Sequence, residues 1–357
     1  MINIEKKFRL FLKKMPNYLL NILLGVSGFF VLYVIFGVEI LKKIEIFNIS
    51  SFANTLDNLF SKYLFIFNYT LVKVFVCKFF VIVLFLRIFK FLLRPKAIVV
   101  CHNTFSNTLS SYDKSIVNDC AVKKIDINLV EQMEQGNIVE AISRQDNIIK
   151  KVLKECDEFT DLIYYGIAHI SLIFRAGFQI GDEGSVRLLH KKRNNQSVFQ
   201  EISSEPDRYH VQLDPFLESY GNSSNEMLVI VATSQQVTDS DIFIFYNRGI
   251  RCKLRFYMRE PSRYDFDEID SYNLMDRLRT NILSEIRQVV KSENIERIHL
   301  VLATSSAFTF FLARSFSKHH DPEVVVYQYE HSTNEKYPWG ISNTRSPETA
   351  VINQRLQ

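Results

Sequence analysis

The pattern of apolar residues changes near residue 94 and divides the chain into two parts. Upstream, apolar residues form two long runs, at residues 18–38 and 63–86. A helix needs about 20 apolar residues to cross the hydrocarbon core of a bilayer, and both runs reach that length. Downstream, apolar runs are short and alternate with amphipathic stretches, which is typical of α/β units on a mostly parallel sheet. We therefore expect a two-helix transmembrane hairpin over residues 18–93 and an α/β domain over residues 94–357.

Basic residues around the two runs predict the orientation of the hairpin. Bases gather on the cytoplasmic side of membrane spans. They are concentrated before the first run (Lys6, Lys7, Arg9, Lys13, Lys14) and after the second (Arg87, Lys90, Arg94, Lys96). Residues 1–17 and the α/β domain are thus both expected in the cytoplasm. A cleavable signal peptide is the alternative for the first run, but its apolar core is too long and no small-residue cleavage site follows it.

Two lysines, Lys73 and Lys78, interrupt the second apolar run. An ammonium near the bilayer centre costs about 2.5–3.5 kcal/mol on insertion scales. One interpretation is that the long side chains extend along the helix until the charges reach water. The other is that the two lysines line a polar path in an oligomeric assembly. The sequence leaves both interpretations open.

The α/β part contains the same order of elements twice. The pattern predicts strands at residues 97–101, 161–165 and 185–190 with helices at 137–156 and 167–176. A second series has strands at 226–233, 297–303 and 323–329 with helices at 272–290 and 305–317. The last three elements of each series align without gaps, so that Leu162 overlies Leu300. This predicts a tandem pair of Rossmann-like units, roughly residues 97–210 and 225–345.

Charge and cysteine content narrow the function. Residues 1–96 hold 14 Lys and Arg against 4 Asp and Glu, or +10, so the chain total of +4 leaves −6 for residues 97–357. A mildly acidic domain lacks the basic footprint expected for binding to polymeric nucleic acid. The five cysteines have no C-x-x-C spacing, which disfavours a zinc site or a disulfide framework.

The sequence also lacks common catalytic motifs. It contains no G-x-S-x-G, H-E-x-x-H, P-loop or G-x-G-x-x-G. His319, His320 and Asp321 form a weak metal candidate at a predicted helix end, and we expect neither a metal nor a cofactor. These absences favour a binding module over an enzyme.

A ligand is expected where the parallel strands end, because open α/β sheets bind ligands beyond the carboxyl ends of their strands. Helix N-termini at that edge suit phosphates. Small or polar residues follow four strands, at residues 101–104, 165–169, 233–235 and 303–306. The loop after the last strand of each unit adds basic or aromatic side chains. The candidate ligand-binding residues are His102, Asn103, Gly166, His169, Lys191, Arg193, Thr233, Ser234, Thr304, Ser305, Tyr329, Glu330, Tyr337 and Trp339.

Within this set, Gly166, Thr304 and Ser305 would allow close approach to the backbone. Tyr337 and Trp339 are placed on a loop, where they could stack on a base. Thr304 and Ser305 could instead only cap a helix, and Trp339 could belong to the core. Two similar units side by side fit a ligand with several phosphates and bases.

The C-terminal stretch RIHLVLATSSAFTFFLARSFSKHHDPEVVVYQYEHS, continuing to Tyr337, resembles the end of SAVED domains. The segment IYYGIAHISLIFRAGFQIGD, followed by G-S-V-R-L-L-H, resembles the first half of the same domain. The resemblance covers roughly residues 97–345, although residues 102–136 match nothing in the pattern. It implies two fused CARF-like Rossmann units and a sensor for a cyclic oligonucleotide made by a CD-NTase, with a cyclic trinucleotide as the expected ligand.

With two transmembrane helices, the architecture is similar to membrane effectors of CBASS antiphage systems. The resemblance implies a multi-pass protein of the bacterial inner membrane. Ligand binding would drive homo-oligomerisation, disruption of the lipid bilayer and abortive infection. Two alternatives remain from the residues alone: a membrane-anchored cyclic-nucleotide hydrolase, and a structural membrane anchor for a partner complex.

Overall fold

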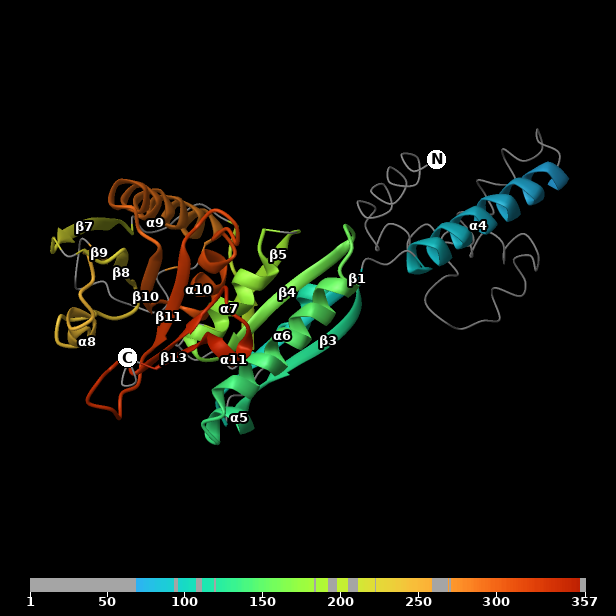
Figure 1. Ribbon diagram of the computed structural model, residues 1–357. Coiled ribbons are helices and arrows are strands. Elements are labelled where there is room, and N and C mark those ends of the chain that lie inside the picture. The colour runs from blue at the N-terminus through green and yellow to red at the C-terminus, as the bar shows by residue number, and fades with distance from the viewer. Residues whose placement is uncertain are drawn as a thin grey trace. The chain divides into compact units, whose positions relative to one another are not determined.

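The computed structural model divides the chain into two compact units, residues 1–94 and 95–357. We describe each unit by itself (Figure 1). The predicted first apolar run, and Arg193 among the candidate ligand-binding residues, lie outside the described residues. The structure describes residues 69–92, 96–106, 111–118, 120–182, 184–191, 198–204, 211–221, 223–258, 269 and 271–353.

Helix α4 (Tyr69–Leu92) is the described element of the first unit. It contains most of the predicted second apolar run but extends six residues beyond it. Several large apolar side chains of α4 are exposed, namely Phe79, Val81, Ile82, Leu84, Phe85 and Ile88. Lys78 is exposed as well. In the described part of the chain, no helix combines the length and the apolar character needed to cross a membrane.

The second unit has two sheets, and each belongs to one half of a tandem repeat (Figure 1). The first half has the strand order β2-β6-β5-β4-β1-β3. Its strands are β1 (Lys96–Asn103), β2 (Ser111–Tyr112), β3 (Ala121–Asn128), β4 (Thr160–Ile167), β5 (Val186–His190) and β6 (Val198–Glu201). Its helices are η2 (Lys114–Val117), α5 (Val130–Glu134), α6 (Ile138–Glu155) and α7 (Ile170–Ile180).

The second half has the strand order β13-β12-β11-β10-β8-β9-β7. Its strands are β7 (Leu213–Ser219), β8 (Glu226–Ala232), β9 (Cys252–Met258), β10 (Arg297–Ala303), β11 (Glu323–Gln328), β12 (Trp339–Ser342) and β13 (Val351–Asn353). Its helices are α8 (Phe243–Tyr246), α9 (Tyr272–Glu293), α10 (Ser306–Ala313) and α11 (Pro347–Ala350).

The two halves share one topology. Strands β3-β1-β4-β5 and β9-β8-β10-β11 are parallel and stand in the same order. An antiparallel strand follows in both halves, β6 beside β5 and β12 beside β11. The two sheets therefore have the mixed α/β architecture expected from the sequence pattern.

Local sequence explains where the main helices begin. Asn137 accepts a hydrogen bond from the backbone N–H of Glu140 at the start of α6. Ser271 caps α9 through the N–H of Leu274, and Ser305 caps α10 through the N–H of Phe308. Such side chains satisfy N–H groups that have no partner within the helix.

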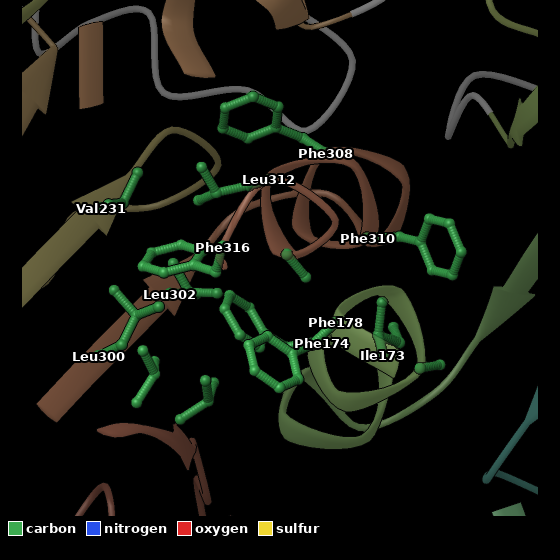
Figure 2. Close-up of a cluster of buried hydrophobic side chains, with 14 of the residues drawn as sticks. Ile173, Phe174, Phe178, Val231, Leu300, Leu302, Phe308, Phe310, Leu312 and Phe316 are labelled. Atoms are coloured by element: carbon green, nitrogen blue, oxygen red, sulfur yellow. The ribbon is translucent and has the colours of Figure 1, made fainter. Parts of the chain in front are cut away.

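Helices α7 and α10 pack against each other between the two halves. Close contact needs a glycine, because a Cβ on Gly177 would lie 2.5 Å from the carbonyl oxygen of Phe310. Phe174 of α7 also packs against Phe316 (Figure 2). Tyr164 of β4 stacks on Phe310 at 3.8 Å between ring centroids. One apolar cluster thus continues from the first half into the second.

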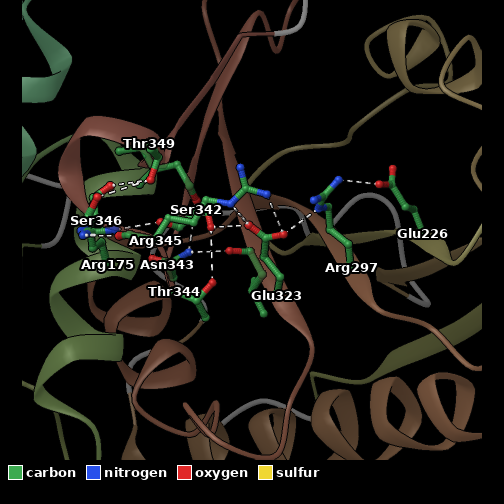
Figure 3. A network of polar contacts seen from close by, with 12 residues as sticks. Arg175, Glu226, Arg297, Glu323, Ser342, Asn343, Thr344, Arg345, Ser346 and Thr349 are labelled. Carbon is green, nitrogen blue, oxygen red and sulfur yellow. Dashed lines mark hydrogen bonds and ion pairs between the residues drawn. The ribbon is translucent and has the colours of Figure 1, made fainter. Parts of the chain in front are cut away.

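A buried arginine also joins the halves. Arg175 of α7 binds both carboxylate oxygens of Asp146 at 2.9 and 2.7 Å, and its side chain is 3% exposed. The same guanidinium donates to the carbonyl oxygens of Ser342 (2.7 Å) and Arg345 (3.1 Å) in the second half (Figure 3). Arg175 therefore fixes α7 relative to the segment that follows β12.

Several predictions from the sequence were wrong in detail. Helix α7 begins at Ile170 and not at residue 167, and α10 ends at Ala313 and not at residue 317. Trp339 lies in strand β12 and not on a loop. The sequence analysis did not predict β2, β3, β6, β7, β9, β12 or β13. Most of these strands are short or lie at the ends of the sheets, but β9 was missed although it has seven mostly buried residues.

Candidate functional site

The carboxyl ends of β1 and β4 in the first half, and of β8 and β10 in the second, form matching joints. The backbone N–H of Thr104, after β1, donates to the carbonyl oxygen of Ile167 at 3.3 Å. The N–H of Thr233, after β8, donates to that of Ala303 at 2.9 Å. In both halves the accepting carbonyl lies two residues before the residue that caps the next helix, His169 or Ser305. The backbone is therefore arranged in the same way at the strand ends of both halves, where the sequence predicts ligand binding.

Side chains from both halves meet beside His169. Its ring stacks on Phe105, with centroids 4.6 Å apart and planes at 19°. Trp339, from β12 of the second half, has its ring centroid 6.2 Å from that of His169 and is buried in the apolar core. The Trp339 indole N–H donates to Glu330 Oε1 at 2.5 Å. These four side chains form what we call the aromatic junction: Phe105, His169, Glu330 and Trp339.

The two candidate histidines of the first half are neutral near pH 7. Burial lowers the pKa of His102 to about 3, with a further lowering from nearby His169. Burial also lowers the pKa of His169 to about 4. Because the charged form is disfavoured in a poorly solvated site, these rings act as neutral hydrogen-bonding groups and not as cations that attract phosphate.

Several predicted residues have structural roles in this conformation. His102 is fully buried, and its Nδ1 lies 2.8 Å from the Tyr164 hydroxyl. A Cβ on Gly166 would overlap the carbonyl oxygen of His102 on the neighbouring strand, so this glycine is required by strand packing. The Thr304 hydroxyl is paired with Thr309 at 2.7 Å, and Ser305 caps α10. The sequence had left the capping role open for Thr304 and Ser305.

The remaining predicted residues divide into buried and accessible groups. Thr233 and Ser234 are buried at the end of β8. Tyr337 is 1% exposed in an apolar cluster, with its ring centroid 5.5 Å from that of Tyr329, so its ring is not available for stacking in this conformation. Asn103 and Lys191 are half-buried at the ends of β1 and β5.

Sequence reasoning missed Phe105 and named Thr104 only as part of a strand end. Phe105 is 40% exposed beside His169, and an aromatic residue two positions after the end of β1 was the signal that the sequence offered. Among the described residues, no group of three or more His, Cys, Asp or Glu side chains could hold a metal ion. Asp321, in the weak metal candidate, is paired with Arg287 at 2.9 Å.

A model of the SAVED family, described as "SMODS-associated and fused to various effectors sensor domain", matches residues 145–342. This is more than half of the chain. The chain belongs to the SAVED family. The match begins within α6 and ends with β12, so it includes the helix pair α7 and α10 and three members of the aromatic junction. It is shorter than the range of resemblance expected from the sequence, because β1, β3 and Thr104 precede it.

Solved structures of SAVED receptors show distant similarity. The Acinetobacter baumannii Cap4 SAVED/CARF-domain receptor with the cyclic trinucleotide 3'3'3'-cAAA has 12% identity and a TM-score of 0.48, covering 80% of this chain and 62% of that chain. The same receptor with 2'3'3'-cAAA has 13% identity and a TM-score of 0.46, covering 78% and 55%. Moraxella osloensis Cap4 has 9% identity and a TM-score of 0.43, covering 80% and 61%.

The chain thus spans about three fifths of the length of these SAVED receptors. A comparison with curated proteins found no match.

Proposed function

We propose that the protein senses a cyclic oligonucleotide through its SAVED domain. The membership in a family of sensor domains carries this proposal. Its ligand, a cyclic trinucleotide in the first place, binds at the carboxyl edges of β1, β4, β8 and β10.

The geometry of the aromatic junction supports this location. Phe105, which is 40% exposed, offers aromatic surface for a base, since stacking on aromatic side chains is a common way to hold unpaired bases. Trp339 lies beside this surface but is itself buried in the apolar core. Helices α7 and α10 begin at the same edge, and the positive ends of helix dipoles favour phosphates. Glu330 and neutral His169 add one acceptor and one polar ring that would suit base edges better than a dense cluster of phosphates.

We further propose that the N-terminal part is a membrane effector of a CBASS system. The two apolar runs with basic flanks support this, as do the exposed apolar side chains of α4. Ligand binding promotes homo-oligomerisation, which clusters the membrane segments. The clustered segments disrupt the bacterial inner membrane and cause abortive infection. In this proposal both termini are cytoplasmic, and the protein is a sensor and not an enzyme.

The decisive experiment uses the full chain in liposomes of bacterial phospholipid that contain a fluorescent dye. Cyclic dinucleotides and trinucleotides are added one at a time, and ligand binding and dye release are measured on the same sample. One ligand is expected to bind, to raise the melting temperature of the SAVED domain by mass action, and to release dye. Recovery of intact ligand after long incubation distinguishes a sensor from a hydrolase.

Three variants separate sensing from membrane disruption. Lys73→Leu/Lys78→Leu tests the polar path: unchanged dye release would remove these lysines from the mechanism. Trp339→Ala should weaken binding and dye release together, whereas Lys123→Ala, on an exposed ion pair of β3, should leave both unchanged. Failure of every cyclic oligonucleotide to bind would refute the sensor and favour an anchor for a partner complex.

A further inference from the structure

The repeat exposes a difference between its halves at one position. Ser305 and His169 are structurally equivalent, since each is the N-cap residue of a helix and each follows by two residues the carbonyl that accepts from Thr233 or Thr104. This equivalence differs by two residues from the gapless alignment expected from the sequence, in which Leu162 overlies Leu300. Ser305 uses its hydroxyl to cap α10 through the N–H of Phe308. His169 makes no side-chain hydrogen bond to α7. The first half therefore has a histidine where helix capping alone would favour serine.

The hydrogen bonds of Thr104 determine which ring nitrogen of His169 carries the proton. Thr104 Oγ1 accepts from the backbone N–H of His169 at 3.0 Å and lies 2.8 Å from His169 Nδ1. Thr104 is 2% exposed. If Nδ1 carried the proton, the buried hydroxyl hydrogen of Thr104 would have no acceptor, at a cost of about 1–3 kcal/mol.

The hydroxyl of Thr104 therefore donates to Nδ1, and the proton of the neutral ring is on Nε2. Protonation of both nitrogens is disfavoured as well, because burial lowers the pKa of His169. The ring cannot turn freely, since it stacks on Phe105 and lies beside Trp339. His169 is thus a neutral, oriented N–H donor within the aromatic junction.

We propose that His169 determines ligand specificity by donating Nε2–H to a hydrogen-bond acceptor of the nucleotide, and that Thr104 is the positioning residue that fixes this tautomer. This inference rests on the proposed function for the identity of the ligand. The acceptor is a ring nitrogen of a base or a phosphate oxygen. An exocyclic amino group at the same place would meet another donor and be rejected.

The tautomer is tested without any ligand. The full chain in detergent micelles is labelled with 15N-histidine, and the side-chain nitrogens are observed by NMR, with His169→Gln used for assignment. We expect a protonated Nε2 and an unprotonated Nδ1 for His169 in the wild type and in Thr104→Ser, which keeps the hydroxyl. Thr104→Val should show a mixture of tautomers. A wild-type ring protonated on Nδ1 would overturn the inference.

Ligand recognition is tested with cyclic triadenylate and the other cyclic trinucleotides as probes. His169→Leu is expected to weaken binding about tenfold and Thr104→Val about fivefold, because each loses about one hydrogen bond. His169→Gln, which keeps an N–H within reach, and Thr104→Ser should stay within about threefold of the wild type. Wild-type affinity in His169→Leu would refute the role of His169.

The source of the acceptor follows from a comparison of cyclic triadenylate with its 7-deaza analogue. If loss of adenine N7 weakens binding to the wild type but not to His169→Leu, the acceptor is the base nitrogen N7. If His169→Leu weakens the binding of both ligands equally, the acceptor is a phosphate oxygen or another base atom. A wild type that binds no probe refutes the proposed function and, with it, the recognition role. The NMR result then still decides whether Thr104 fixes the tautomer.

Discussion

Replacement of Arg175 by methionine should destabilise the SAVED domain strongly. Methionine fills much of the same volume but leaves the carboxylate of Asp146 without its partner. That carboxylate is 9% exposed, so water can compensate for little of the lost interaction. The carbonyl oxygens of Ser342 and Arg345 also lose their charged donor. The change therefore affects both halves of the repeat together.

The magnitude follows from burial. Breaking a buried ion pair by removing one partner costs about 3–5 kcal/mol. Exposed pairs contribute about 0–1 kcal/mol, so Lys123→Met is the matched control, because the side chains of Lys123 and Glu155 are 58% and 40% exposed. For a domain of this size, about 3–5 kcal/mol corresponds to a fall in melting temperature of roughly 6–15 °C.

Trp339 provides the assay. It is the only tryptophan of the chain, it is 8% exposed, and it lies on β12, whose last residue accepts from Arg175. Its fluorescence should therefore report unfolding of this region in urea or on heating. Full-length wild type, Arg175→Met and Lys123→Met are compared in the same detergent micelles.

A double-mutant cycle gives the refuting result. In Asp146→Asn/Arg175→Met the uncompensated charge is gone, so this variant should be more stable than Arg175→Met alone, and the coupling energy should exceed about 0.5 kcal/mol. Two results would contradict the reasoning: a loss below about 1 kcal/mol in Arg175→Met, or strictly additive single changes. Either would mean that the guanidinium does not compensate Asp146 in solution.

Three further predictions concern the packing and the histidines. Gly177→Ala should lower the melting temperature through a loss of about 1–3 kcal/mol, because its Cβ would meet Phe310 and Ala313; wild-type stability would contradict the close contact of α7 and α10. Phe310→Ala, which removes the ring stacked on Tyr164, should cost about 3–5 kcal/mol in urea unfolding, and a loss below about 1 kcal/mol would refute this contact. Stability should also fall as the pH drops from about 6.5 towards 4: the pKa values of His102 and His169 are lowered to about 3 and about 4, so the unfolded chain binds more protons in this window. His102→Gln should flatten this fall in urea midpoints measured between pH 7.5 and 5, and an unchanged slope would show that His102 is not the buried neutral group described.

The sequence predicted the elements whose local pattern is strong. Strands β4, β8, β10 and β11 are buried on both faces, and such strands appear as short continuous apolar runs. Helices α6 and α9 have one apolar face and clear capping residues. By contrast, β3 has one buried residue, Ile127, among eight. Backbone pairing with β1 makes this segment a strand, although the pattern of its own side chains does not indicate one.

The membrane hairpin stays a prediction, as does ligand binding by the candidate residues. The sequence directed attention to the strand ends, since topology fixes where parallel strands end. It did not separate side chains that support the fold from side chains that face a ligand. Tyr337 and Trp339 are two residues apart and both are buried, yet Tyr337 belongs to one apolar cluster and Trp339 to another, where it lies beside His169.

By itself, the sequence determined that the chain has a strongly apolar, basic N-terminal part and a duplicated α/β domain, because hydrophobic periodicity and charge are local properties. Only the tertiary structure decided that His169 of the first half lies beside Trp339 of the second, and that Thr104 holds its ring. These contacts join residues that are far apart in the chain, Thr104 with His169 and His169 with Trp339. They arise from the packing of separate elements, and no local pattern encodes them.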